Sequence, residues 1–161
     1  MRSRILGGLC AALALFACML AWQSEARAGG KSDSKVKATA TATKAGADGK
    51  QTITITLEIE KGWHIYANPV GDETFEDNRT RVAVKAKEKL MVNVKYPAGK
   101  QRVEKVGKEE FKIRIYEGKV VIQAEVTRTM GDGAPLQISI DVNSCDEKTC
   151  LPPGTLKLTV P

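Results

Sequence analysis

The sequence predicts an all-β protein, an antiparallel β-sandwich of about eight or nine strands. Apolar and polar residues alternate in many short segments, as they do in strands that bury one face. Glycine, proline or aspartate stands at most joints between these segments. No segment after residue 28 shows a convincing helical period of 3.6 residues. Many short strands with regular turns are typical of a sandwich.

The clearest strand is 51–60, in which the apolar residues at 53, 55, 57 and 59 share one face. The opposite face carries threonines and Glu58, so this strand is expected to cover a core. The other expected strands, in chain order, are 36–43, 80–87, 90–97, 111–118, 119–128, 136–145 and 155–160. The longest segment without a strand pattern is 67–79, which is expected to be a loop.

The first 28 residues have the composition of a secretory signal peptide. Arg2 and Arg4 precede an apolar run over 5–22, and small residues end the segment at Ala28. An uncleaved membrane anchor, or a lipoprotein modified at Cys18, stays open as an alternative. Residues 29–35 are then expected to be a flexible leader, and residues 36–161 a single domain.

Charge argues against nucleic acid as a partner. Cleavage after Ala28 would remove three arginines and one glutamate, and would lower the net charge from +6 to +4. The remaining charges of both signs are interspersed along the chain, with no basic patch that alternates with aromatic residues. A solvated surface explains this distribution.

Cys145 and Cys150 are the only cysteines after residue 28. Four residues separate them, and a connection of that length between antiparallel strands would place them opposite each other, with Cα atoms about 4.5–5.5 Å apart. In an exported protein such a pair is normally oxidised. The closed loop is short, so a disulfide there would contribute only about 2 kcal/mol as a staple. The spacing leaves a structural disulfide and a redox-active pair both open.

Other chemistry at this pair has little support. A closed zinc site needs four ligands, and the chain beyond residue 28 offers the two cysteines and one histidine, His64. No metal or other cofactor is therefore expected. A single histidine also gives no catalytic triad. Pro152 and Pro153 disfavour a helix after Cys150, and Asp146 adds negative charge, so an ordinary or raised thiol pKa is expected.

Four segments together resemble one known family. They are 61–71, 94–100, 109–118 and 145–153, and they are similar to parts of the periplasmic N-terminal domain of the thiol:disulfide interchange protein DsbD. The resemblance covers most of residues 35–161. Its most specific part is the ending, in which Cys150 is followed by Leu151, Pro152 and Pro153.

The resemblance implies an immunoglobulin-like sandwich that exchanges thiols and disulfides in the periplasm. Cys145 and Cys150 match the family's redox pair, and the resemblance favours Cys150 as the sulfur that partners attack. The partners implied are thioredoxin-like periplasmic proteins and a membrane electron donor. Phe111, preceded by Glu109 and Glu110, resembles the phenylalanine of a loop that caps the disulfide.

Four further residues match the family near its cysteines. Trp63, His64 and Tyr66 match an aromatic stretch near the family's cysteines, and Pro152 matches its proline-rich ending. From the residues alone, Phe111 fits a core position and His64 fits an exposed strand position.

The chain departs from the family in several ways. It has four residues between the cysteines, where the family pattern has five, and a shorter segment after Phe111. It also carries no membrane domain and no thioredoxin domain, so its electron donor is expected to be a separate protein.

Two functions remain in competition after these arguments. The first is an exported thiol-disulfide oxidoreductase that carries reducing equivalents through Cys145 and Cys150. The second is a non-catalytic binding or scaffold module in which the same pair is a structural disulfide.

Overall fold

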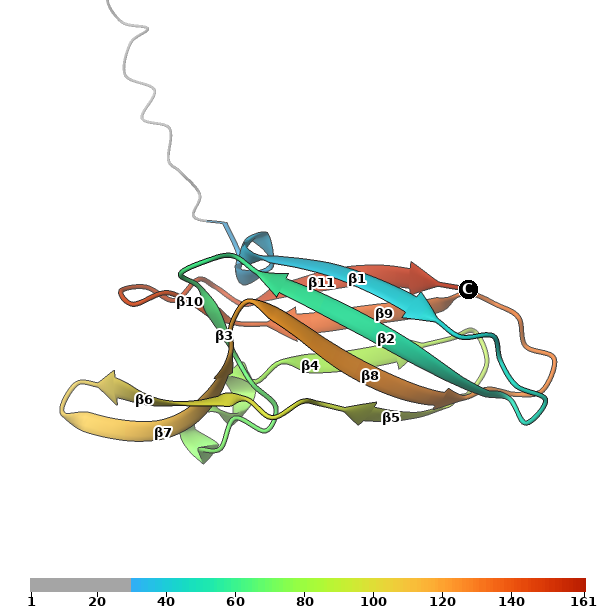
Figure 1. Cartoon of the computed structure of the whole chain (residues 1–161), viewed down its shortest axis with the longest axis horizontal. Helices are drawn as coiled ribbons and strands as arrows, with labels where there is room; N and C mark the ends of the chain where they lie inside the picture. Colours follow the sequence, from blue (N-terminus) through green and yellow to red (C-terminus); the bar gives the residue numbers. More distant parts are fainter. Residues whose placement is uncertain (1–29) are drawn as a thin grey trace, which may run out of the picture.

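The computed structural model describes residues 30–161, which form a β-sandwich made only of antiparallel pairings (Figure 1). The strands are β1 (Val36–Ala42), β2 (Lys50–Ile59), β3 (His64–Tyr66), β4 (Arg81–Lys85), β5 (Met91–Lys95), β6 (Lys100–Val106), β7 (Glu109–Tyr116), β8 (Lys119–Thr127), β9 (Leu136–Val142), β10 (Ser144–Cys145) and β11 (Gly154–Val160). Two 3-10 helices, η1 (Ser32–Lys35) and η2 (Glu73–Asn78), complete the described elements. The sheet orders are β1-β2-β8-β5, β11-β9-β4 and β10-β3-β7-β6. The all-β, antiparallel expectation is confirmed.

The main core lies between the sheet β1-β2-β8-β5 and the sheet β11-β9-β4. The alternation expected in β2 is confirmed, because Ile53, Ile55 and Leu57 are fully buried. Ile55 pairs across the ladder with Ile122 of β8, which is also fully buried. β9 supplies Ile140 and other alternating residues to the same cluster. We use "main core" for this group of mostly aliphatic side chains.

A second, smaller cluster lies on the sheet β10-β3-β7-β6. It consists of Tyr66, Val70, Phe75, Ile113, Ile115 and Cys145, with Phe111 packed against it. We call this group the aromatic cluster. It is the part of the described fold that holds one of the two cysteines.

Several strands differ from the sequence expectation. The segment 136–145 is two strands, because the chain leaves the sheet of β9 at Asn143 and joins β3 as β10. β6 was not expected as a strand, and β3 was expected only in so far as His64 fitted a strand position. η2 lies in the segment expected to be a loop. β6 pairs only with β7, and its Val103 and Val106 are half exposed, so it lacks the alternation that marks a strand over a core.

The chain before β1 also differs from the expectation. Within the segment 29–35, expected to be a flexible leader, Ser32–Lys35 form η1, and Ser32 is completely buried. The expected signal peptide, 1–28, lies outside the described residues. Within residues 30–161, no helix has the length and apolar character needed to cross a membrane.

Candidate functional site

The two cysteines form a disulfide in a tight hairpin between β10 and β11. Cys145 and Cys150 face each other as an antiparallel bridge, and their Cα atoms are 4.0 Å apart. The expected opposition of the pair is therefore confirmed. Their surroundings differ sharply: Cys145 is 2% exposed within the aromatic cluster, whereas Cys150 is exposed to solvent. One cysteine of the bond is therefore on the surface and the other is in the interior.

Asp146 shapes the turn between the cysteines. Its carboxylate accepts hydrogen bonds from the backbone N–H groups of Lys148 and Thr149, both at 2.7 Å. These bonds lower the pKa of the Asp146 carboxyl below its ordinary value, so the carboxylate is charged at neutral pH. This negative charge is adjacent in sequence to Cys145.

Ser32 holds the backbone on both sides of the hairpin. Its hydroxyl accepts from the N–H of Ser144 at 2.8 Å and donates to the carbonyl of Leu151 at 3.3 Å. Its own N–H donates to the carbonyl of Pro152, and its carbonyl accepts from the Ser144 hydroxyl, both at 2.9 Å. A Cβ at Gly154 would collide with the backbone of Asp33, so η1 packs directly on the start of β11. We call these four hydrogen bonds the Ser32 clamp.

Tyr66 contacts the buried sulfur directly. Its hydroxyl lies 3.7 Å from Cys145 Sγ, and because a disulfide sulfur carries no proton, the hydroxyl is the donor. Burial raises the pKa of Tyr66 above its ordinary value, and Glu104 acts in the same direction. The hydroxyl therefore keeps its proton at neutral pH. The sequence assigned Tyr66 to this neighbourhood, and the structure brings it against Cys145.

His64 is opposite Cys145 in the short ladder between β3 and β10. The expectation of an exposed strand residue was wrong, since His64 is only 2% exposed. Its Nδ1 lies 3.5 Å from Nη1 of Arg102, and none of the described residues offers a partner to its Nε2. Burial, followed by the positive charge of Arg102, lowers the pKa of His64 to about 4. The ring is therefore neutral at neutral pH.

Two further aromatic rings pack in succession on Tyr66. Phe75 stacks on Tyr66 with ring centroids 5.6 Å apart, and Phe111 meets Phe75 edge-on at 5.4 Å. Phe111 is half-buried and belongs to this cluster, so it reaches Cys145 through two other rings. The sequence reasoning missed Phe75. Its signal was a single aromatic residue in a polar loop, which buries itself when η2 forms after the Asp72 cap.

The other expected site residues lie farther from this cluster. Glu109 and Glu110 are exposed at the start of β7, in the hairpin with β6, where Glu110 pairs with Lys105. Trp63 packs against the main core, with Lys35 Nζ 4.8 Å from its ring centroid. Pro152 is exposed and contributes its carbonyl to the Ser32 clamp.

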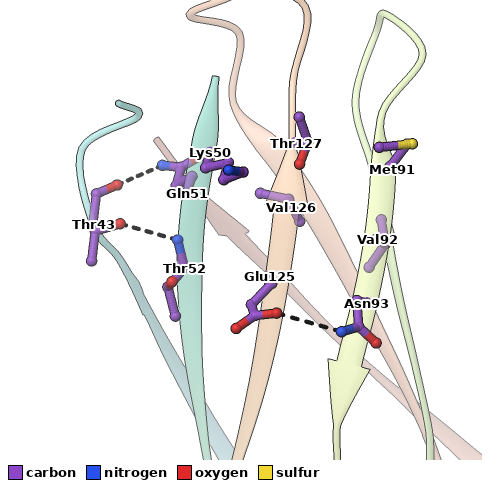
Figure 2. A pocket seen from close by; sticks show the side chains of 10 residues that line it. All are labelled: Thr43, Lys50, Gln51, Thr52, Met91, Val92, Asn93, Glu125, Val126 and Thr127. Atoms are coloured by element: carbon purple, nitrogen blue, oxygen red, sulfur yellow. Dashed lines mark hydrogen bonds between the residues drawn. The ribbon is translucent and has the colours of Figure 1, made fainter. Parts of the chain in front are cut away.

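A pocket of about 400 Å³ lies on a different part of the molecule, across β2, β8 and β5 (Figure 2). Its polar groups bond to one another, for example Asn93 Nδ2 to Glu125 at 3.4 Å and Gln51 Nε2 to the carbonyl of Thr43 at 2.7 Å. They do not converge on a ligand, and no cysteine lines the pocket. Within residues 30–161 no group of three or more His, Cys, Asp or Glu side chains is placed to hold a metal ion.

The fold and this site define a class: β-sandwich domains that carry a disulfide in a short hairpin, with one sulfur exposed. Residues 33–161 match the family described as "Thiol:disulfide interchange protein DsbD, N-terminal". The chain belongs to this family, as the sequence resemblance implied. No curated protein matches the chain in sequence.

Solved structures agree with the fold. The DsbD N-terminal domain of Neisseria meningitidis, in its complex with the PilB N-terminal domain, has a TM-score of 0.51 and 11% identity, over 80% of this chain and 84% of that chain. The reduced form of the Neisseria domain gives 0.49 and 13%, over 73% and 80%. The N-terminal periplasmic domain of ScsB from Proteus mirabilis gives 0.46 and 16%, over 76% and 44%. The first of these similarities supports the expected immunoglobulin-like sandwich.

Proposed function

We propose that this protein is a periplasmic carrier of reducing equivalents, which exchanges disulfides with thioredoxin-like proteins through Cys145 and Cys150. The observation that carries the proposal is the asymmetry of the bond: Cys150 is exposed, while Cys145 is buried in the aromatic cluster. Membership in the DsbD N-terminal family supports thiol-disulfide interchange. The neighbour solved in complex with the PilB N-terminal domain supports a protein as the partner.

The exchange proceeds by two displacements at sulfur. A thiolate of the reduced partner attacks Cys150 Sγ, the Cys145–Cys150 bond breaks, and its electron pair leaves on Cys145. A mixed disulfide now joins the partner to Cys150. The partner's second thiolate then attacks its own sulfur and releases Cys150. Two electrons have moved from the partner dithiol to this protein, and the two cysteines take up protons.

The surroundings of each cysteine suit these steps. Cys150 is exposed at the end of the hairpin, so a second protein can approach it from solvent. The sulfur of Cys145 leaves into the aromatic cluster, where the Tyr66 hydroxyl is already placed to donate to it. Hydrogen bonds to an ionised acceptor are stronger than those to a neutral one, so this contact strengthens as the bond breaks. From the family resemblance we propose that Phe111, which packs against the aromatic cluster, limits access to the disulfide.

The redox potential of the pair tests the proposal. Protein beginning at Gly30 is equilibrated in mixtures of reduced and oxidised thiol, the free thiols are trapped, and the products are read by mass. A potential above about −300 mV marks an exchangeable disulfide. A potential well below this value, with no exchange by a thioredoxin-like reductant, makes the bond structural and favours the binding or scaffold module.

A matched pair of cysteine variants tests which sulfur is attacked. Cys145→Ser leaves the exposed Cys150 as a single thiol. It should form a stable mixed disulfide with a thioredoxin-like protein that keeps one cysteine, activated as a mixed disulfide with a small aromatic thiol, because that thiol leaves and no second cysteine can reverse the exchange. Cys150→Ser leaves only the buried Cys145, and should capture little. Equal capture by the two variants would contradict the assignment of Cys150 as the attacked residue.

A further inference from the structure

His64 is a buried imidazole for which the proposed exchange has so far supplied no role. It is the only histidine of the chain, and it lies directly opposite Cys145 in the ladder of β3 and β10. Residues opposite each other in an antiparallel pair have their side chains on the same face, with Cβ atoms about 4.5–5.5 Å apart. Tyr66, two residues along β3, shares that face and already reaches Cys145 Sγ. His64 therefore borders the same sulfur.

The contact with Arg102 fixes the tautomer of the ring. A guanidinium group has only donors, so the Nδ1 atom, 3.5 Å from Arg102 Nη1, must be the acceptor of this pair. In a neutral imidazole the proton then resides on Nε2. The two nitrogens point away from each other, and Arg102 lies on β6, beyond β7 as seen from β3. Nε2 is therefore turned away from β6, towards the side of β10.

The Nε2–H group has no hydrogen-bond partner among the described residues, although it is buried. An unpaired buried donor destabilises the oxidised protein, and it is explained if the donor is used in another state. The oxidised sulfur of Cys145 is a weak acceptor. The thiolate that leaves Cys150 during exchange is a strong one, and it is formed where little water can solvate it.

We infer that the Nε2–H of His64 donates a hydrogen bond to the sulfur of Cys145 when the disulfide opens, as a second donor beside the Tyr66 hydroxyl. His64 is thus a catalytic residue of the exchange, and this role rests on the proposed function. The charged groups that act on His64 are Arg102 of β6, Glu117 after β7 and Asp146 after β10. Burial keeps the ring neutral, so the donor is available over the whole neutral range.

The test measures the pKa of a single thiol. In protein beginning at Gly30, Cys150→Ser leaves Cys145 as the only cysteine, and its ionisation is followed by thiolate absorbance. Adding His64→Phe keeps a ring but removes the donor, and should raise the Cys145 pKa by about one unit, a roughly tenfold loss of thiolate at a given pH. His64→Gln retains an N–H donor and should give a smaller rise. Ile65→Val, on the opposite face of β3, is the matched control and should give none.

The result that overturns the inference is a folded His64→Phe variant whose Cys145 pKa equals that of its parent. Should that variant not fold, nitrogen NMR of the unsubstituted protein decides, because the one histidine gives one set of ring signals. In the reduced protein, raising the pH until the Cys145 thiol ionises should shift the Nε2–H proton downfield as it gains a thiolate acceptor, and a signal that does not move refutes the inference. The thiol titration uses no partner protein, so a protein that fails to exchange with any partner would overturn only the proposed function.

Discussion

The main core and the aromatic cluster are both buried, but they are built from different chemistry. The main core is mostly aliphatic, lies between two sheets and joins residues from β2, β8 and β9. The aromatic cluster is smaller, lies on the third sheet, and contains a disulfide sulfur and a phenol hydroxyl that touch each other. The difference indicates that one group of side chains provides most of the stability and the other surrounds the reactive sulfur. A substitution in the main core should therefore change the free energy of unfolding without changing the redox potential, and a substitution beside the sulfur should do the reverse.

The largest effect is expected in the main core. Ile55 is fully buried, and Ile55→Ala should lower the free energy of unfolding by about 2–5 kcal/mol, because it removes apolar contacts and leaves a cavity. Denaturant unfolding measures this change. Val121→Ala, on the exposed face of the adjacent strand, is the control and should cost about 0.5 kcal/mol or less. A large shift in the redox potential of folded Ile55→Ala would contradict the view that the main core and the aromatic cluster act independently.

The second effect is a loss of stability in mild acid, caused by His64. Its pKa is about 4 in the fold and 6.5 in a model peptide, so the unfolded chain binds more protons between these values. Stability from this group is complete above pH 6.5 and is lost as the pH falls towards 4. From pH 7 to pH 5 the loss should be about 2 kcal/mol. Denaturant unfolding of the protein and of His64→Gln at both values measures it. The same pH dependence in both proteins would refute the assignment.

A third prediction compares two tyrosines. Tyr66→Phe removes the hydroxyl that meets Cys145, and should slow reduction of the disulfide roughly fivefold, which corresponds to about 1 kcal/mol. Tyr116→Phe removes a hydroxyl that donates to the carbonyl of Pro97 at 2.9 Å and has no hydrogen bond to a sulfur. This control should lose about 1 kcal/mol of stability and keep its exchange rate. Stopped-flow reduction and denaturant unfolding separate the two outcomes, and equal rates in both variants would contradict the role of Tyr66.

The smallest effect is expected at Phe111. Phe111→Leu keeps most of the apolar volume but loses the edge contact with Phe75, worth roughly 0.5 kcal/mol at the low end for aromatic pairs. Reduction by glutathione should become slightly faster, since the outermost ring of the cluster no longer shields the sulfur. The rate constant with glutathione measures this. A slower reaction would show that Phe111 does not limit access.

The sequence predicted strands best where burial is strongest. β2, β8 and β9 alternate because one face lies on the main core, and this alternation is visible in the residues themselves. β6 escaped prediction because it projects with β7 and has charged residues on both faces (Figure 1). η1 escaped because "SDSK" reads as a polar leader. Its order comes from hydrogen bonds to residues more than a hundred positions away, which local composition does not encode.

The candidate site was also predictable only where local sequence determines the geometry. The spacing of Cys145 and Cys150 was enough to place them opposite each other, because a short hairpin has few geometries. The burial of His64 was not predictable, since it depends on β10 leaving β9 at Asn143 and pairing with β3. Phe75 depended on the same long-range packing. The family resemblance predicted that Tyr66 and His64 lie near the cysteines, and the structure shows how each of them contacts or pairs with Cys145.

The Ser32 clamp has a mechanical consequence for the hairpin. The carbonyl of Ser144 accepts from the N–H of Leu151 at 2.9 Å, and Asp146 N–H donates to the Thr149 carbonyl at 2.9 Å, so backbone bonds already close the loop that the sulfurs close. Because Ser32 also bonds to the backbone on both sides of the hairpin, the hairpin does not depend on the disulfide to stay closed. In the proposed exchange, the backbone of the hairpin should therefore keep its conformation when the disulfide opens, so that oxidised and reduced protein present the same surface to a partner.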